Sequence, residues 1–169
     1  IMCGILALFG ESVDTSSHLL THRGPDDYRT QTLGKCHMDF YRLAINDLTD
    51  TGMQPFRSES GMLICNGEIY NHKELASGYE KGKSDCEVLI HLIEIYRILE
   101  ASKIIKGDFA LLYTDGKRVI ASRDPFRVRP MFYTRYDDGF IAFASEIKAL
   151  RFLKTKIDIF PPGHIYDSY

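Results

Sequence analysis

Cys3, in the stretch "IMCGILALFG", is the residue best suited to chemistry. One interpretation is a buried thiol, because free cysteine packs as a small hydrophobic group. The other is that removal of Ile1 and Met2 makes Cys3 the first residue. It would then supply a thiol nucleophile and an α-amino group with a pKa of about 7.7–8.0, which suits a general base. With Ile1 and Met2 attached, the nitrogen of Cys3 is an amide and cannot act as a base, so we expect the printed form to be inert.

A second candidate stretch is "CNGEIYN" (65–71), which follows a short apolar run. Asn66 and Gly67 favour a tight turn at the end of a strand. They are also suited to an oxyanion hole, because the Asn66 amide and the Gly67 N–H can point at one spot. Glu68 beside them would add an acceptor for a substrate N–H group. These residues alone leave both interpretations open.

Three further stretches carry charges that fit more than one role. Arg42 in "YRLAIND" either extends to solvent or holds a carboxylate with its planar guanidinium. Asp85 in "SDCEV" either stabilises the dipole of a predicted helix or binds a substrate ammonium group. "THRGPDD" (21–27) is typical of a loop turn with solvated charges.

The composition excludes several classes of protein. Apolar residues make up 44% and charged residues 26% of the 169 residues, which is ordinary for one globular domain. Lys plus Arg number 21 against 23 Asp plus Glu, so we expect neither nucleic acid nor a membrane surface as a partner. The cysteines, Cys3, Cys36, Cys65 and Cys86, lack zinc spacing, and we expect reduced thiols and no metal site. With no long apolar stretch or secretory signal, we expect a soluble, cytoplasmic protein.

The elements that must position these residues are mostly strands. Short apolar runs predict strands over 5–9, 40–45, 62–65, 109–113, 119–121, 131–134 and 140–144. Asp115-Gly116 and Asp138-Gly139 predict two hairpins, because Asp-Gly suits a type I′ turn. Since the order is no regular βαβ alternation, the fold class is α+β with antiparallel sheets.

The predicted helices are fewer. The strongest begins at Ser84, which forms a capping box with Glu87. Its apolar face consists of Val88, Leu89, Leu92, Ile95, Tyr96 and Leu99. Shorter helices are predicted near Asn71 and near Ser145, where the serine can cap.

Taken together and in order, these stretches resemble the glutaminase domain of glutamine-dependent asparagine synthetases. That domain belongs to the class II glutamine amidotransferases, within the N-terminal nucleophile hydrolases. The resemblance covers nearly the whole chain and rests on "MCGILALFG", "HRGPDD", "RLAINDLTDTGMQPF", "NGEIYNHKEL", "SDCEV", "GDFALLYTD", "ASRDPF", "RPMFY", "FASEIKAL" and "PPGHIYD".

The resemblance implies a role for each candidate residue. Cys3 would attack the glutamine side-chain amide, and Asn66 and Gly67 would form the oxyanion hole. Arg42 would bind the α-carboxylate, while Asp85 and Glu68 would bind the amine and amide nitrogens. The implied substrate-binding set is Arg42, Leu43, Ala44, Ile45, Asn46, Asn66, Gly67, Glu68 and Asp85.

The resemblance also implies the architecture and partners. The expected fold is a four-layer α-β-β-α sandwich, formed by residues 1–169 as one domain. Glutamine is the expected substrate, hydrolysis needs no cofactor, and a synthetase domain or subunit would accept the ammonia. ATP and Mg would bind only in that synthetase domain, which we expect to be absent from this chain. Self-association into a homo-oligomer is left open.

Departures from the family pattern also generate expectations. Arg127 stands where the family has glycine, so a turn that needs a positive φ is expected to be strained there. Asp108 replaces an apolar residue of the family pattern. The segment 10–18 is short, so the first family helix is expected to be truncated. Two other function hypotheses remain: a catalytically silent glutamine-binding or regulatory module, and a structural domain with Cys3 in its core.

Overall fold

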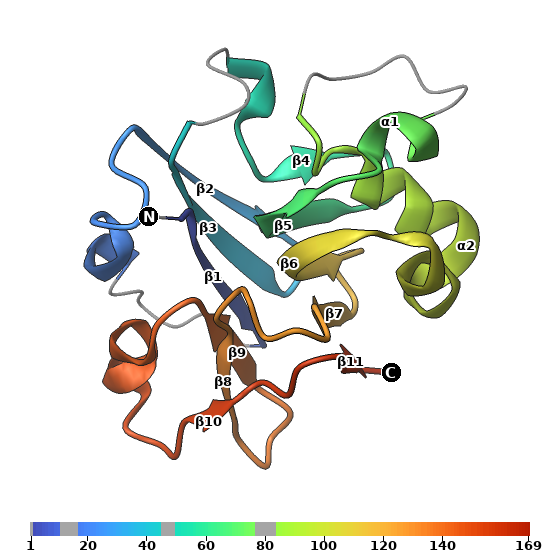
Figure 1. Cartoon of the computed structure of the whole chain (residues 1–169). Helices are drawn as coiled ribbons and strands as arrows, with labels where there is room; N and C mark the ends of the chain where they lie inside the picture. The colour runs from blue at the N-terminus through green and yellow to red at the C-terminus, as the bar shows by residue number, and fades with distance from the viewer. Residues whose placement is uncertain (1, 11–16, 45–49, 77–83) are drawn as a thin grey trace.

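The computed structural model describes residues 2–10, 17–44, 50–76 and 84–169. Within these ranges, the strands form two antiparallel sheets that lie face to face (Figure 1). The six-stranded sheet has the order β10-β8-β9-β1-β3-β2, and the five-stranded sheet has the order β11-β7-β6-β5-β4. The strands are β1 (Gly4–Phe9), β2 (Asp27–Leu33), β3 (Cys36–Arg42), β4 (Phe56–Arg57), β5 (Met62–Ile69), β6 (Gly107–Thr114), β7 (Val119–Arg123), β8 (Phe132–Arg135), β9 (Ile141–Ala144), β10 (Asp158–Ile159) and β11 (Ile165–Asp167).

Strand β1 lies inside the six-stranded sheet, between β3 and β9. Ile5 and Ala7 point into the core between the sheets, whereas Leu6 and Leu8 point into a second core on the outer face. Burial on both faces explains the uninterrupted apolar run. The two flanking strands therefore fix the backbone that follows Cys3.

Helices cover the outer face of each sheet. Helix α2 (Val88–Ile104) packs on the five-stranded sheet, and the short α1 (His72–Leu75) follows β5. The 3₁₀ helices η1 (Ser17–Leu20) and η3 (Ile147–Leu153) pack on the six-stranded sheet (Figure 1); η2 (Asp50–Gly52) lies before β4. The predicted α+β sandwich of two antiparallel sheets is confirmed, although one outer layer consists of 3₁₀ turns.

The predicted apolar face of α2 is correct only in its first half. Val88, Leu89 and Leu92 are buried, but Ile95, Tyr96 and Leu99 are 70%, 52% and 61% exposed. The backbone leaves the helical region at Arg97 (φ 62°, ψ 157°), so one helical periodicity cannot describe both halves. The second half buries Ile98 and Ala101 instead.

Both predicted serine caps are wrong. Helix α2 begins at Val88, with Glu87 in the cap position and no capping hydrogen bond from its side chain. Ser84 contributes its backbone carbonyl, which accepts the Glu87 N–H at 3.3 Å. The Ser145 hydroxyl accepts the Ile5 N–H at 3.0 Å, so it fixes the first strand and does not cap η3.

The predicted hairpins are confirmed, and the missed strands lie at sheet edges. Strands β6 and β7 pair across Gly116 (φ 86°), and β8 and β9 pair across Gly139 (φ 90°). Strand β2, with the polar sequence DYRTQTL, has no apolar run to reveal it. The strand predicted over 40–45 is β3, which begins at Cys36 and ends at Arg42; residue 45 lies outside the described ranges.

Arg127 confirms the expectation of a strained turn, because its φ is 61°. We predict that Arg127→Gly raises the free energy of unfolding by about 1 kcal/mol, because glycine removes the steric strain of the left-handed backbone. The greater conformational entropy of glycine in the unfolded chain offsets part of this gain. Urea denaturation measures the change. Arg127→Ala is the control: it removes the same charge but keeps Cβ, and an equal gain in this variant would contradict the strain argument.

Candidate active site

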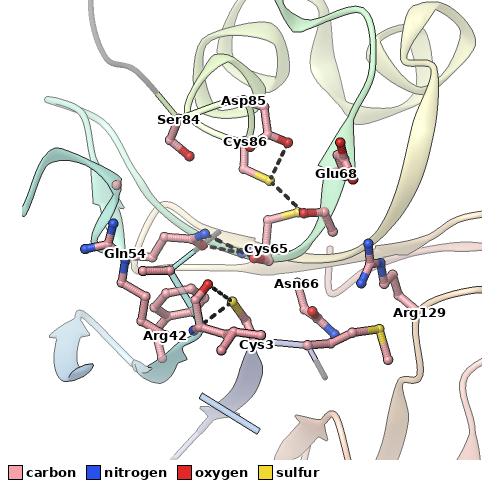
Figure 2. A pocket seen from close by; sticks show the side chains of 16 residues that line it. Cys3, Arg42, Gln54, Cys65, Asn66, Glu68, Ser84, Asp85, Cys86 and Arg129 are labelled. Atoms are coloured by element: carbon pink, nitrogen blue, oxygen red, sulfur yellow. Dashed lines mark hydrogen bonds between the residues drawn. The ribbon is translucent and has the colours of Figure 1, made fainter. Parts of the chain in front are cut away.

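One pocket contains every predicted site residue that the structure describes (Figure 2). It opens between the start of β1, the end of β3 and the strand β5, with the turn before α2 on its far wall. Ile45 and Asn46 lie outside the described residues. The lining residues are Met2, Cys3, Phe40, Arg42, Leu43, Ala44, Gly52, Gln54, Cys65, Asn66, Gly67, Glu68, Ser84, Asp85, Cys86 and Arg129.

The half-buried thiol of Cys3 lies against the backbone that follows β3. Its Sγ accepts the Leu43 N–H at 3.3 Å and donates to the Leu43 carbonyl at 3.6 Å. Burial raises the pKa of this thiol, and the nearby guanidinium groups of Arg129 and Arg23 oppose that shift. The sulfur therefore keeps its proton near neutral pH and needs a base before it can act as a nucleophile.

The other cysteines are more deeply buried than Cys3. Burial raises the pKa of Cys36 to about 12. A hydrogen bond with Cys65, together with burial, raises the pKa of Cys86 well above its ordinary value. Cys86 also donates to the Gly67 carbonyl at 3.6 Å, so its thiol supports the pocket wall. Among the described cysteines, Cys3 is thus the one whose exposure suits reaction with a substrate.

Arg23 has a contact that sequence reasoning missed. The turn sequence favours a solvated charge at this position, but Arg23 Nε donates to the Cys3 carbonyl at 3.1 Å. Its Nη1 also pairs with Glu146 at 3.1 Å, and the side chain is only 12% exposed. A basic residue before a Gly-Pro turn carries no local sign of this contact, because Glu146 and Cys3 are distant in the sequence.

Asn66 presents a buried donor to the pocket. The residue is 1% exposed, and its Nδ2 has no hydrogen-bond partner among the residues that the structure describes. Leaving a buried donor unpaired costs about 1–3 kcal/mol, so such a group favours a ligand that accepts its hydrogen bond. Figure 2 shows Asn66 and Cys3 at the same side of the pocket.

Gly67 is required where β5 and β6 approach each other. A Cβ at this position would lie 2.4 Å from the Asp108 carbonyl oxygen, too close for any side chain. The glycine keeps the backbone beside Asn66 in the pocket wall, and a backbone N–H there can join the Asn66 amide as a donor.

Gln54 is a second residue that sequence reasoning missed. It is 5% exposed, and its Nε2 donates to the Cys65 carbonyl at 3.1 Å. Its Oε1 accepts the Cys65 N–H at 2.6 Å. This double contact fixes β5 one residue before Asn66. A glutamine in a loop gives no sequence signal of such a role, since most loop glutamines are exposed.

Arg42 and Asp85 bring opposite charges to the pocket from different elements. Arg42 is the last residue of β3 and is 6% exposed. Asp85 is 8% exposed, lies before the first turn of α2, and accepts the Ile69 N–H at 2.7 Å. A cation and an anion in one pocket can bind the α-carboxylate and α-ammonium groups of an amino acid.

Among the described residues, no group of three or more His, Cys, Asp or Glu side chains could hold a metal ion. None of the helices in the described ranges is both long enough and apolar enough to cross a membrane.

Comparisons with solved structures show the fold. The glutamine phosphoribosylpyrophosphate amidotransferase from Bacillus subtilis, complexed with ADP and GMP, gives a TM-score of 0.80 at 21% identity, over 98% of this chain and 47% of that one. A structure described as the allosteric regulatory enzyme of purine biosynthesis gives 0.82 at 23% identity, over 98% and 46%.

Comparisons with known sequences show the family. Asparagine synthetase [glutamine-hydrolyzing] from Bos taurus and that from Homo sapiens are each 40% identical over 185 aligned positions, which cover 96% of this chain and 33% of theirs. Asparagine synthetase [glutamine-hydrolyzing] 2 of Oryza sativa is 40% identical, with 99% and 31% covered. The chain thus spans about a third of the length of these relatives. Because the model of the glutamine amidotransferase domain also matches residues 2–161, the chain belongs to the class II glutamine amidotransferase family.

Proposed function

We propose that this chain hydrolyses the side-chain amide of glutamine to glutamate and ammonia, with Cys3 as the nucleophile once it is the first residue. The observation that carries the proposal is that one pocket contains both the half-buried Cys3 thiol and the buried Asn66 amide, whose Nδ2 has no partner among the described residues. The relatives are asparagine synthetases described as glutamine-hydrolyzing, which supports glutamine as the substrate.

The proposed mechanism uses the α-amine of Cys3 as the base. The amine takes the thiol proton, and sulfur attacks the amide carbon of glutamine to form a tetrahedral intermediate. Asn66 Nδ2 and the Gly67 N–H donate to the oxygen that becomes negative. The α-ammonium group then protonates the leaving nitrogen, ammonia departs, and a γ-glutamyl thioester remains. Water hydrolyses this thioester to glutamate and frees the thiol.

Charged groups in the pocket orient the substrate in this proposal. Arg42 binds the α-carboxylate, Asp85 binds the α-ammonium group, and Glu68 accepts a hydrogen bond from the amide nitrogen. The backbone of Leu43 and Ala44 lies beside the reacting sulfur. Ile45 and Asn46 remain predicted members of the same wall.

The ammonia would serve asparagine synthesis or a related amidation in the cytoplasm. The relatives' names support this use of the ammonia, whereas the cytoplasmic location stays a prediction from the sequence. In this proposal the chain is one glutaminase domain, and a synthetase domain or subunit that binds ATP and Mg accepts the ammonia. Glutamine hydrolysis itself needs no cofactor.

The state of the N-terminus decides activity. We predict that a chain beginning at Cys3 releases ammonia from glutamine and is labelled at Cys3 by the glutamine analogue diazo-oxo-norleucine, whereas a chain that keeps Met2 does neither. Mass spectrometry of the N-terminal peptide and an ammonia assay measure both results. Cys3→Ala should abolish both, and Cys36→Ala, which removes a buried thiol outside the pocket, should retain both. A processed chain that binds glutamine without releasing ammonia would favour the silent glutamine-binding module.

Loss of the Asn66 donor should slow the reaction more than it weakens binding. Because the oxyanion exists only after attack, Asn66→Ala is expected to lower kcat by about 10²–10³-fold with a small change in KM. Asn66→Asp keeps the shape but replaces the donor with an acceptor, and it should lose at least as much. A fall in substrate affinity with normal kcat would contradict the role.

The pH dependence of kcat/KM should follow the ionisation of the Cys3 α-amine. Since burial raises the pKa of the Cys3 thiol, sulfur is protonated near pH 7 and reaction depends on a neutral α-amine. The kcat/KM for the processed chain should therefore rise with pH through about 7.7–8.0 and then level off. In the chain that keeps Met2, iodoacetamide alkylation of Cys3 should rise only above the ordinary pKa of a thiol. Identical profiles for the two chains would show that the amine is not the base.

A further inference from the structure

Two carboxylates lie opposite each other on the neighbouring strands β5 and β6, at the end of the five-stranded sheet that borders the pocket. The register of β5 with β6 places Glu68 directly opposite Asp108. Both share the strand face of Ile64 and Ala110, which pack between the sheets. Like charges at directly opposed positions destabilise a sheet unless a cation compensates them.

The compensating cation is Arg129. Its Nε and its Nη2 each lie 2.7 Å from Asp108 Oδ1, and the two side chains are 15% and 14% exposed. The second Asp108 oxygen accepts the Tyr70 hydroxyl at 2.9 Å. Both oxygens of Asp108 are thus engaged, which fixes the guanidinium from one side.

The backbone fixes Arg129 from the other side. Its N–H donates to Asp124 Oδ2 at 3.1 Å, and its carbonyl accepts from Arg123 Nε at 2.6 Å. Asp124 and Arg123 are 0% and 4% exposed, so this support is rigid. Figure 2 shows the Arg129 side chain on the same side of the pocket as Asn66 and Glu68.

Glu68 keeps an open carboxylate in spite of this neighbour. The residue is exposed, and no hydrogen bond or ion pair of its side chain occurs among the described residues. Arg129 and Glu68 line the same pocket, yet the guanidinium pairs with Asp108. A competing carboxylate therefore determines which acid the arginine holds.

We propose that Asp108 is a positioning residue for the glutamine pocket: it retains Arg129 so that Glu68 remains available to the substrate's amide nitrogen. The proposal rests on the proposed glutaminase function for the role of Glu68. Without Asp108, the contacts that hold Arg129 within the described residues are those of its backbone, and Glu68 on the neighbouring strand becomes the partner of its guanidinium. An arginine paired with Glu68 would occupy the oxygen that the substrate needs.

The test compares Asp108→Asn with the double variant Asp108→Asn/Arg129→Gln in the processed chain. Asp108→Asn should raise KM for glutamine about tenfold, equivalent to about 1.4 kcal/mol, and change kcat less. The double variant should recover most of this loss, because no unpaired cation remains. Asp158→Asn, which breaks the exposed pair with Lys156, is the matched control and should leave KM within about twofold.

Two results would overturn the inference. An unchanged KM in Asp108→Asn contradicts it, and so does a double variant as impaired as the single one, which would indicate a merely structural ion pair. A crystal structure of Asp108→Asn gives a readout independent of activity: Arg129 should lie within hydrogen-bond distance of Glu68, and an arginine in its original place would refute the proposal. Wild-type protein that hydrolyses no glutamine would instead contradict the proposed function and leave this structural test decisive.

Discussion

The pocket is arranged around one constraint, a buried hydrogen-bond donor on Asn66 that has no partner within the part of the chain that the structure describes. The Asn66 amide nitrogen could not stay unpaired if its strand were free to shift, since pairing would recover about 1–3 kcal/mol. Gln54 prevents that shift, because it binds both the N–H and the carbonyl of Cys65. Gly67 also helps to fix the strand, because β6 lies so close to it that no residue with a Cβ would fit there. The cost of the unpaired donor is thus sustained by contacts on either side of it, as is typical of preorganised sites.

The same logic applies to Cys3, the proposed nucleophile, which precedes a strand fixed from both sides. Strand β1 is paired with β3 and β9, and the Ser145 hydroxyl binds the Ile5 N–H. Arg23 then holds the Cys3 carbonyl. As the first residue of the proposed processed chain, Cys3 would need such support, because a chain terminus ordinarily frays. Once its α-amine is free, only the side chain and the amine retain freedom to rotate toward a substrate.

Sequence reasoning predicted the parts of this arrangement that depend on local chemistry. The Asp-Gly hairpins and the buried strands follow from short-range rules. The expectation of a positive φ at Arg127 depends instead on the family resemblance, which implies glycine at that position. Strand β2 was missed because an edge strand needs no apolar run, and the second half of α2 was wrong because tertiary packing overrode its periodicity. The candidate site came from the resemblance, whereas Gln54 and Arg23 could not be found, since their partners are set by the fold.

Charge pairing determines which ionisable groups of the pocket remain open to a substrate. Glutamine carries one α-carboxylate and one α-ammonium group, so a pocket that binds both groups needs a free charge of each sign. Arg42 and Asp85 offer one charge of each sign from separate elements. The further cation, Arg129, pairs with Asp108. With Glu68 on the neighbouring strand, this wall of the pocket carries two carboxylates against one guanidinium. In our proposal Asp108 therefore does not neutralise the wall but determines which carboxylate holds Arg129, and it leaves the negative charge of Glu68 open to the substrate.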